Sequence, residues 1–451
     1  MSADDLTTFL PFCSAAGITW HDNLRLTLTE GEGGGVFAAG PIAAGEVAIS
    51  VPRAAALAAP ASEIAASLGS KHALALAAWQ AKSAATNLAP WVALWPKITE
   101  GSWSLDGQAK SALNWCTELH RLDSQEGSAA SRALSEVIVP RLQASGHVVP
   151  SAGEYQWGLG VVSSRAADVM ISGEARPTLL PLIDMMNHRG KAEASLALAF
   201  EPATDCVVAR VVSPAGLQAG DPLTICYGEK DNAHLLHGYG FACRPNPNDT
   251  VLVRVPVGNC VSDPLAMQRA AMLPRGALDD QAMDPGGGGG DLAAWGMLTW
   301  CKVGRGAGKA QEPVPKLSAD LQVLLSMASA ASVEQMFAAM TMAAMAGGDV
   351  GDGGDVQTEG EVGGEVGGGK LASEAFDPST LSASAWELLA TCCAAALAAL
   401  PPPKPAEAPA SEEPPIVRAA AVALEARRDL LQASLSAAKV AAAAAATPTM
   451  S

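Results

Sequence analysis

The sequence predicts an α+β fold, with strands and helices in its first half and an all-α second half. Short β-branched segments bounded by Gly, Pro, Asn or Asp occur before and after a long region of helical spacing. Beyond about residue 260 the strand pattern stops, and Gly-rich and Pro-rich stretches separate segments of helical spacing. With 451 residues, of which 49% are hydrophobic, the chain is long enough to bury a sizeable core in two or three domains.

Local patterns predict the elements of the first half. Alternation from Val47 to Val51, with turn residues at Gly40-Pro41 and Gly45, predicts a short hairpin over residues 36–52. Helical spacing with Ser62 as the N-cap predicts a helix over residues 62–82, and more helix is expected to about residue 145. Residues 155–171 predict one further helix. Four strands are then expected, at residues 196–200, 206–212, 223–226 and 250–257.

The second half is predicted to be helical. Three helices are expected, at residues 317–346, at residues 386–400 and at the end of the chain. The second would have one apolar face formed by Trp386, Leu389, Cys393, Leu397 and Leu400. The third would have one formed by Val417, Leu424, Leu431 and Leu435. The acidic, Gly-rich composition of residues 346–380 predicts a disordered loop, and residues 401–415 predict a Pro-rich linker.

Charge and hydropathy limit the partners. The formal net charge of −17 argues against nucleic acid and favours a basic protein or peptide. Eight acidic residues and one lysine between residues 349 and 377 give −7 of this charge. No apolar run reaches the roughly 18 residues of a membrane span, and the N-terminal residues lack a targeting pattern. We therefore expect a monomeric cytosolic or nuclear protein, or a chloroplast protein whose transit peptide has been removed or is atypical.

Several familiar motifs fail on inspection. The nine Cys residues are never spaced as C-x-x-C, so neither a disulfide framework nor a zinc ribbon is expected, and no metal site is predicted. The segment GEGGG at 31–35 lacks the third Gly of a dinucleotide loop, and GRGAGK at 304–309 lacks the first Gly and the final Ser or Thr of a phosphate loop. Neither G-x-S-x-G nor H-E-x-x-H occurs, which argues against a hydrolase or a zinc peptidase.

Four segments become meaningful as an ordered set: TEGEGGGVFAAGPIAAGEVAISVP (29–52), WGLGVVSSRAADV (157–169), LLPLIDMMNHRG (179–190) and LTICYGEKDNAHLLHGYGF (223–241). In order and spacing they resemble SET-domain protein methyltransferases of the Rubisco large-subunit lysine methyltransferase-like group. The resemblance covers nearly the whole chain. It implies a SET-domain β-fold of short strands over residues 1–258, and a helical substrate-binding domain over residues 259–451. The SET domain would comprise an N-terminal part (about 20–60), a helical insertion (about 61–150) and a C-terminal part (about 151–245).

The resemblance also implies a cofactor, S-adenosylmethionine. Its binding residues would be Glu32, Gly33, Gly34, Gly35, Ser164, Arg165, Asn187 and His188. Glycine allows backbone to approach a ligand without a Cβ, and the planar guanidinium of Arg165 suits a carboxylate. Taken without the family, Asn187-His188 is more typical of a satisfied turn than of a ligand site, and a structural ion pair is the alternative role for Arg165.

By the same resemblance, Tyr227 and Tyr239 are the catalytic residues, Asp184 and Tyr227 contact the substrate, and Asn232 braces the loop. Asp184 is equally consistent with a capping role or with a network in the core. Methyl transfer needs a neutral amine, and deprotonating a lysine of pKa near 10.4 at pH 7 costs about 4.6 kcal/mol. A desolvating channel lowers that cost, so alignment and preorganised electrostatics suffice without a strong base. The Tyr227 phenol must then lie within about 15 Å of the His188 imidazole, the span of one ligand pocket.

The sequence departs from this family at several positions. Gly34 replaces a leucine of the Rubisco-type enzyme, Val169 replaces an arginine, and the chain has only three Tyr. The Cys-rich zinc segment of many histone-directed SET domains is absent. The expected function is S-adenosylmethionine-dependent N-methylation of lysine in a non-histone protein. A histidine-directed methyltransferase, a non-catalytic SET-fold binding protein and a helical scaffold remain open.

Overall fold

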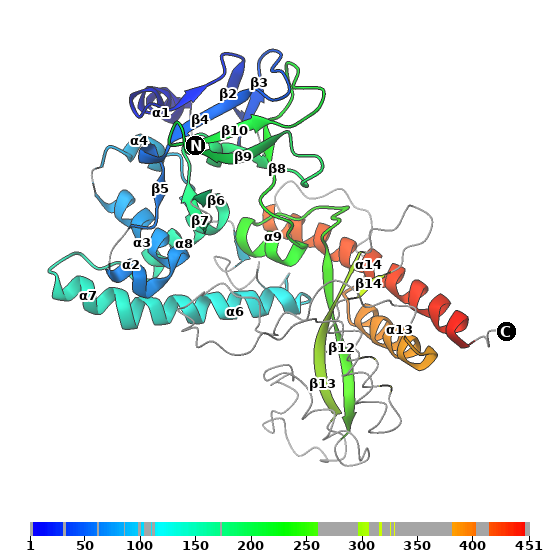
Figure 1. Cartoon of the computed structure of the whole chain (residues 1–451). Helices are drawn as coiled ribbons and strands as arrows, with labels where there is room; N and C mark the ends of the chain where they lie inside the picture. The colour runs from blue at the N-terminus through cyan, green and yellow to red at the C-terminus, as the bar shows by residue number, and fades with distance from the viewer. Residues whose placement is uncertain are drawn as a thin grey trace, which may run out of the picture. The chain divides into compact units, whose positions relative to one another are not determined.

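The computed structural model in Figure 1 describes residues 3–29, 33–60, 63–84, 86–97, 101–102, 110, 113–171, 174–259, 296–305, 315–317, 325, 329, 381–402 and 415–446. The chain divides into two compact units. The first unit comprises residues 1–114, 119–242 and 411–420, and the second comprises residues 115–118, 243–410 and 421–451. The boundary at residue 258 between the SET domain and the substrate-binding domain stays a prediction.

Short strands form four small sheets in the first unit. The largest is antiparallel, in the order β1 (Thr19–Trp20), β4 (Val47–Pro52), β10 (Cys206–Val211) and β9 (Leu196–Glu201). The others are the hairpin of β2 (Leu24–Thr29) and β3 (Gly33–Ala38), the three-stranded β5 (Leu57–Ala58), β7 (Glu174–Leu179) and β6 (Ala167–Ile171), and the parallel pair β8 (Asn187–His188) and β11 (Thr224–Ile225).

The described helices of this unit lie mostly on one side of these sheets (Figure 1). They are α1 (Ala3–Ala15), α2 (Glu63–Leu68), α3 (Ser70–Ser83), α4 (Ala89–Val92), α6 (Thr117–Arg132), α7 (Val139–Ala144), α8 (Ala152–Arg165) and α9 (Asn232–Tyr239). A π-helical segment at Ala133–Ile138 joins α6 to α7, just before Pro140, whose missing N–H interrupts the α-helical ladder. One apolar core runs through the unit and includes Phe9, Ile49, Trp91 and Leu159.

Three predictions for this unit were wrong in their details, and the first two concern residues 36–52 and 155–171. The segment 36–52 is not a hairpin: β3 pairs with β2, whereas β4 pairs with β1 and β10. Alternation identifies a strand but not its partner, and the intervening loop is held by Ile42, which pairs with Leu217. The helix expected over 155–171 begins earlier and ends at Arg165, because Ala166 is extended and residues 167–171 form β6.

The helix predicted over 62–82 is two helices, α2 and α3. They are separated at Gly69, whose φ of +74° suits glycine. The start of α8 is fixed by a capping box, in which the Ser151 hydroxyl accepts the Glu154 N–H and the Glu154 carboxylate accepts the Ser151 N–H. The sequence signal for that start was Ser151 followed by Glu154.

The second unit contains the predicted C-terminal helices, α13 (Ala383–Ala398) and α14 (Pro415–Ala446). It also contains a three-stranded antiparallel sheet of β12 (Thr250–Asn259), β13 (Gly296–Arg305) and β14 (Pro315–Leu317), so the expectation of an all-α second half needs correcting. Pairing with β12 favours strand for β13, which its local pattern does not reveal. The predicted helix 317–346, acidic loop and Pro-rich linker lie almost entirely outside the described residues.

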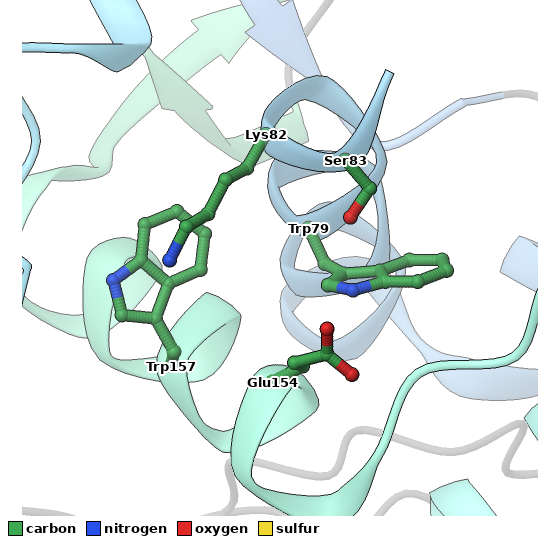
Figure 2. Close-up of a pocket in the computed structure, with 5 residues that line it drawn as sticks. All are labelled: Trp79, Lys82, Ser83, Glu154 and Trp157. Atoms are coloured by element: carbon green, nitrogen blue, oxygen red, sulfur yellow. The ribbon is translucent and has the colours of Figure 1, made fainter.

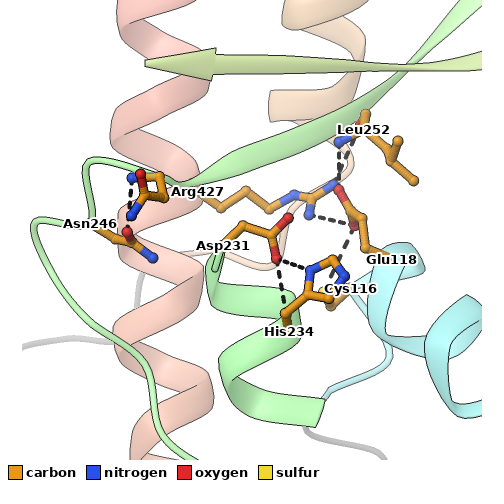
Figure 3. A network of polar contacts seen from close by, with 8 residues as sticks. Cys116, Glu118, Asp231, His234, Asn246, Leu252 and Arg427 are labelled. Carbon is orange, nitrogen blue, oxygen red and sulfur yellow. Dashed lines mark hydrogen bonds and ion pairs between the residues drawn. The ribbon is translucent and has the colours of Figure 1, made fainter. Parts of the chain in front are cut away.

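A buried ion pair lies in the second unit. Arg427 of α14 donates to the Glu118 carboxylate at 2.7 Å and to the Leu252 carbonyl at 3.4 Å, and the Leu252 N–H donates to Glu118 (Figure 3). Arg427 also lies 5.9 Å from the ring centroid of Trp115. The core of this unit includes Trp386, Leu389 and Cys393, as predicted for α13.

Candidate functional site

The Asn187-His188 segment is positioned by a parallel strand pair. Thr224 lies opposite Asn187 and Ile225 opposite His188, and the Arg189 N–H donates to the Ile225 carbonyl at 3.1 Å. Leu182, just upstream, is buried and has a φ of +70°, which is strained for leucine. Such strain is typical of segments whose geometry serves a function. The register places Tyr227, two residues beyond Ile225, beside His188.

His188 is held as a neutral hydrogen-bond acceptor. Its Nδ1 accepts the backbone N–H of Tyr227 at 3.1 Å. Burial lowers the pKa of His188 below its usual value, and the nearby charges of Arg189 and Lys230 lower it further. Because Nδ1 accepts, the proton of the neutral ring is on Nε2.

Four rings form the aromatic cluster of the site: His188, Tyr227, Tyr239 and Phe241. Ring centroids are 5.1 Å apart for His188 and Tyr227, and 4.8 Å apart for Tyr227 and Tyr239, which are stacked at 24°. Phe241 lies 5.7 Å from His188 and 5.9 Å from Tyr239. The 5.1 Å separation is well inside the roughly 15 Å that a single pocket allows.

The end of α9 places Tyr239 and Phe241 in this cluster. Asp231 caps the helix by accepting the His234 N–H at 2.9 Å, and Asn232 is buried in its first turn. Gly240 ends the helix with a φ of +75°, a conformation that glycine adopts at low cost. The chain therefore turns sharply between the two rings.

Tyr227 is oriented by a short hydrogen bond. Its hydroxyl donates to the Met186 carbonyl at 2.6 Å. Burial raises the pKa of Tyr227 to about 12, with Arg165 opposing and Asp184 adding to the shift. The phenol is therefore neutral at physiological pH. With its proton directed at Met186, its oxygen lone pairs are free to face a cationic group.

The glycine strand reaches the same region. In β3, Gly33 and Gly34 lie opposite Thr29 and Leu28 of β2. A Cβ on Gly35 would lie 2.8 Å from the Phe37 ring and 3.5 Å from the Asn187 side-chain nitrogen. Gly35 therefore lies close to Asn187, and a larger residue at this position would require the Phe37 ring to shift. Glu32 lies outside the described residues.

Arg165 and Asp184 form a second polar group beside the aromatic cluster. Arg165 donates to the Asp184 carbonyl at 3.0 Å and lies 3.7 Å from its carboxylate, which accepts the Trp91 indole N–H at 3.0 Å. The Asp184 side chain is 1% exposed. Burial raises the pKa of Asp184, and Arg165 opposes that shift. The Nε of Arg165 is buried without a hydrogen-bond partner among the described residues.

Most of the predicted site residues thus come together in the first unit, but two differ from expectation in their contacts. The Ser164 hydroxyl donates to the Gly160 carbonyl of its own helix at 2.7 Å, so its expected role with the cofactor stays a prediction. Asp184 belongs to a buried network, and its substrate contact also stays a prediction. Among the described residues, no group of three or more His, Cys, Asp or Glu side chains is arranged to hold a metal ion. No described helix is both long and apolar enough to cross a membrane.

Comparison with solved structures decides the fold. The structure of the Rubisco LSMT SET domain bound to lysine and AdoHcy superposes with a TM-score of 0.64 at 16% identity, covering 97% of this chain and 91% of that one. The Rubisco LSMT structure bound to AdoMet superposes with a TM-score of 0.63 at 15% identity, covering 99% of this chain and 94% of that one. The chain has the SET fold.

Curated relatives of this SET-fold chain are methyltransferases. Ribosomal lysine N-methyltransferase set10 of Schizosaccharomyces pombe is 35% identical over 122 residues, which are 26% of this chain and 21% of that protein. Mouse actin-histidine N-methyltransferase is 28% identical over 127 residues, 28% of this chain and 20% of that protein. N-lysine methyltransferase setd6 of Xenopus laevis is 25% identical over 276 residues, 54% of this chain and 58% of that protein. The chain thus spans from a fifth to under three fifths of these relatives' lengths. No protein-family model matches it.

Two residues of the SET-fold site were missed from the sequence. Trp91 lies in α4 and contacts Asp184 across 93 positions of sequence, so no local pattern links the two. Phe241 was part of the Tyr-Gly-Phe segment, but no role was assigned to it. The glycine between Tyr239 and Phe241 was the signal available in the sequence, because glycine permits a sharp turn between two rings; its left-handed φ is seen only in the structure.

Proposed function

We propose that the chain is an S-adenosylmethionine-dependent methyltransferase that modifies a lysine of a non-histone protein. The observation that carries the proposal is the convergence of Gly35, Asn187, His188, Tyr227 and Tyr239, which come from three of the four ordered segments, on one site. This convergence supports a ligand site rather than a helical scaffold, because a scaffold does not require it. The SET fold of the chain supports the reaction class.

The residues present fit the cofactor. Gly35 and Asn187 are so close that backbone, rather than side chain, would form the wall of the cofactor site. The unpartnered Nε of Arg165 leaves a charged donor available, and a carboxylate such as that of the cofactor's amino-acid end suits its fork. When bound, S-adenosylmethionine supplies a methyl group on a positively charged sulfur, which transfers to a neutral amine.

Tyr227 and the Met186 carbonyl provide the electrostatic complement. Their two oxygens lie 2.6 Å apart and both carry partial negative charge. They would therefore favour positive charge on a bound sulfonium group, and the Tyr227 oxygen could accept a hydrogen bond from the substrate amine. Tyr239 stacks on Tyr227 and holds its ring angle. A proton is lost from the ammonium to water before transfer, and the buried rings lower that cost by disfavouring the charged amine.

The test combines binding with methyl transfer. Calorimetry of the full chain with S-adenosylmethionine should show a single site. Labelled methyl groups should then pass to a protein in lysate and appear on lysine by mass spectrometry. In Tyr227→Phe we expect kcat to fall by about 10²-fold, as for loss of one preorganised polar group, with cofactor affinity within threefold. Absence of cofactor binding would remove the proposal altogether.

Histidine methylation is the second candidate. The 28% identity to mouse actin-histidine N-methyltransferase over 127 residues, which are 28% of this chain, favours it. The same mass spectra separate the two functions, because the label is found on imidazole nitrogen in one case and on lysine nitrogen in the other. Cofactor binding without any labelled protein would instead support a non-catalytic SET-fold binding protein.

A further inference from the structure

A separate cleft lies between α3 and α8. It has a volume of about 250 Å³ and is lined by Trp79, Lys82, Ser83, Glu154 and Trp157 (Figure 2). The proposed methyl-transfer site contains none of these residues. The two helices pass very close to each other at Gly158 of α8 and Ala75 of α3. A Cβ on Gly158 would collide with the Ala75 carbonyl. This crossing fixes the separation of the two indoles, which come from different helices.

Trp157 is a preorganised ring. Its Nε1 donates to the Pro96 carbonyl at 2.8 Å, and its ring packs 6.1 Å from that of Trp95. The Lys82 ammonium lies 3.7 Å from the Trp157 ring centroid, well within the roughly 6 Å range of a cation–π contact. The chain's own lysine therefore shows that this ring face accepts an alkylammonium group.

Trp79 and Glu154 form the other side of the cleft. Trp79 is 4% exposed, so its indole is almost entirely buried. Figure 2 shows this indole nitrogen on the side of the ring next to the Glu154 carboxylate. Glu154 is held in place by its capping bonds to Ser151. The cleft thus combines two indoles with one fixed carboxylate.

We infer that this cleft is a binding site for a methylated lysine side chain of a partner protein, and that Lys82 occupies it in the absence of the partner. A volume of about 250 Å³ is below the roughly 300–1,000 Å³ of drug-sized pockets and suits a single side chain. When a cationic side chain of the partner displaces the Lys82 ammonium from the cleft, a positive charge still lies in the cleft with the Glu154 carboxylate. The net charge of −17 favours a basic partner.

Methylation gives the incoming group its advantage over Lys82. A primary ammonium is strongly hydrated, so bringing it onto a ring costs solvation. Methyl groups weaken that hydration and enlarge the contact with the aromatic faces, which is how aromatic cages recognise quaternary ammonium ligands. The Trp157 face, which Lys82 covers in this structure, then makes a larger contact with the methylated group, and the buried Trp79 lines the other side of the cleft.

The test measures binding to the full chain without S-adenosylmethionine, so it is independent of whether the chain transfers methyl groups. The probes are labelled short Gly-Ser peptides with one trimethyllysine, one unmodified lysine or one acetyllysine, read by fluorescence anisotropy. We expect the trimethyllysine peptide to bind at least tenfold more tightly than the other two. Equal binding of all three, or no binding, overturns the inference. Choline chloride competing as well as the trimethyllysine peptide would overturn the protein partner in favour of a small amine.

Variants locate the site. Lys82→Ala vacates the Trp157 face and should tighten trimethyllysine binding several-fold, a gain that misfolding cannot produce. Trp157→Phe keeps a smaller ring and should weaken binding several-fold, and Trp157→Ala at least tenfold, with folding checked by circular dichroism. The matched control is Lys97→Ala, an exposed lysine of the same insertion, which should change affinity by less than twofold. Weaker or unchanged binding in Lys82→Ala overturns the inference.

Discussion

His188 joins two parts of the candidate site through one imidazole. Its Nδ1 holds the Tyr227 backbone, and its ring packs on Tyr227 and Phe241. The backbone bond exists only while Nδ1 is unprotonated. Protonation of this one ring would therefore release the backbone N–H of Tyr227, two residues beyond the end of β11.

Acid should accordingly weaken the site. The pKa of His188 is lower in the folded protein than in the unfolded chain, where it is about 6.5. The stability that the neutral imidazole contributes is therefore fully present above pH 6.5 and is lost as the pH falls through the folded-state pKa. We expect the dissociation constant of S-adenosylmethionine, measured by calorimetry from about pH 8 to 5, to rise on the acid side. His188→Gln should flatten this dependence, whereas His147→Gln, at an exposed position, should retain it. An affinity that does not change with pH in the unmodified chain would contradict this role.

Trp91 positions Arg165 through Asp184. The indole N–H satisfies one oxygen of a carboxylate that is almost fully buried, and that residue in turn holds the guanidinium. Trp91→Phe keeps an aromatic ring but leaves the carboxylate short of a donor, at a cost of about 1–3 kcal/mol in unfolding free energy. We also expect cofactor affinity to fall several-fold, because Arg165 loses its support.

Urea denaturation and calorimetry measure the two effects. The control is Trp20→Phe, a half-buried indole of β1, a strand that contributes no residue to the site. If Trp91→Phe lowers stability but leaves cofactor affinity unchanged, Trp91 is a structural residue and does not position Arg165.

At the scale of elements, the crossing of α3 and α8 offers a matched pair of glycines in one helix. A Cβ on Gly158 would collide with the Ala75 carbonyl, whereas a Cβ on Gly153 would meet nothing within 4 Å. Gly158→Ala should destabilise the protein by about 1–3 kcal/mol through overpacking. Gly153→Ala should be neutral or stabilise by up to about 1 kcal/mol, because alanine favours helix. Thermal unfolding of both variants checks this, and equal effects would mean that the helices can separate at no cost.

Local patterns predict elements better than they predict contacts between elements. The alternation of Leu196 to Phe200 and the β-branched run after Cys206 correctly indicated β9 and β10. The partner of β3 was wrong and β13 was not predicted, because strand pairing depends on residues far away in the sequence. The same limit applies to the site. Asn187-His188 and Tyr227 could be identified from ordered motifs, but Trp91 could not, because only the fold brings it to Asp184.

For the whole molecule, long-range charge should govern encounters with a basic substrate. The formal net charge is −17, and residues 349–377 contribute −7 of it, leaving −10 for the rest of the chain. Attraction between a chain of this charge and a cationic protein is screened over about 10 Å at 0.1 M salt. We therefore expect kcat/KM for a basic protein substrate to fall several-fold between about 20 and 300 mM salt, with kcat unchanged.

Replacing residues 349–377 by an uncharged Gly-Ser segment of equal length should flatten that salt dependence, since it removes −7 of the −17. Methylation of a short neutral lysine peptide serves as the control, because steering acts little on it and its rate should vary by less than twofold. A steep salt dependence that persists after the replacement would place the steering charge on the folded surface, since electrostatic attraction depends on the charges that remain close to the docking face.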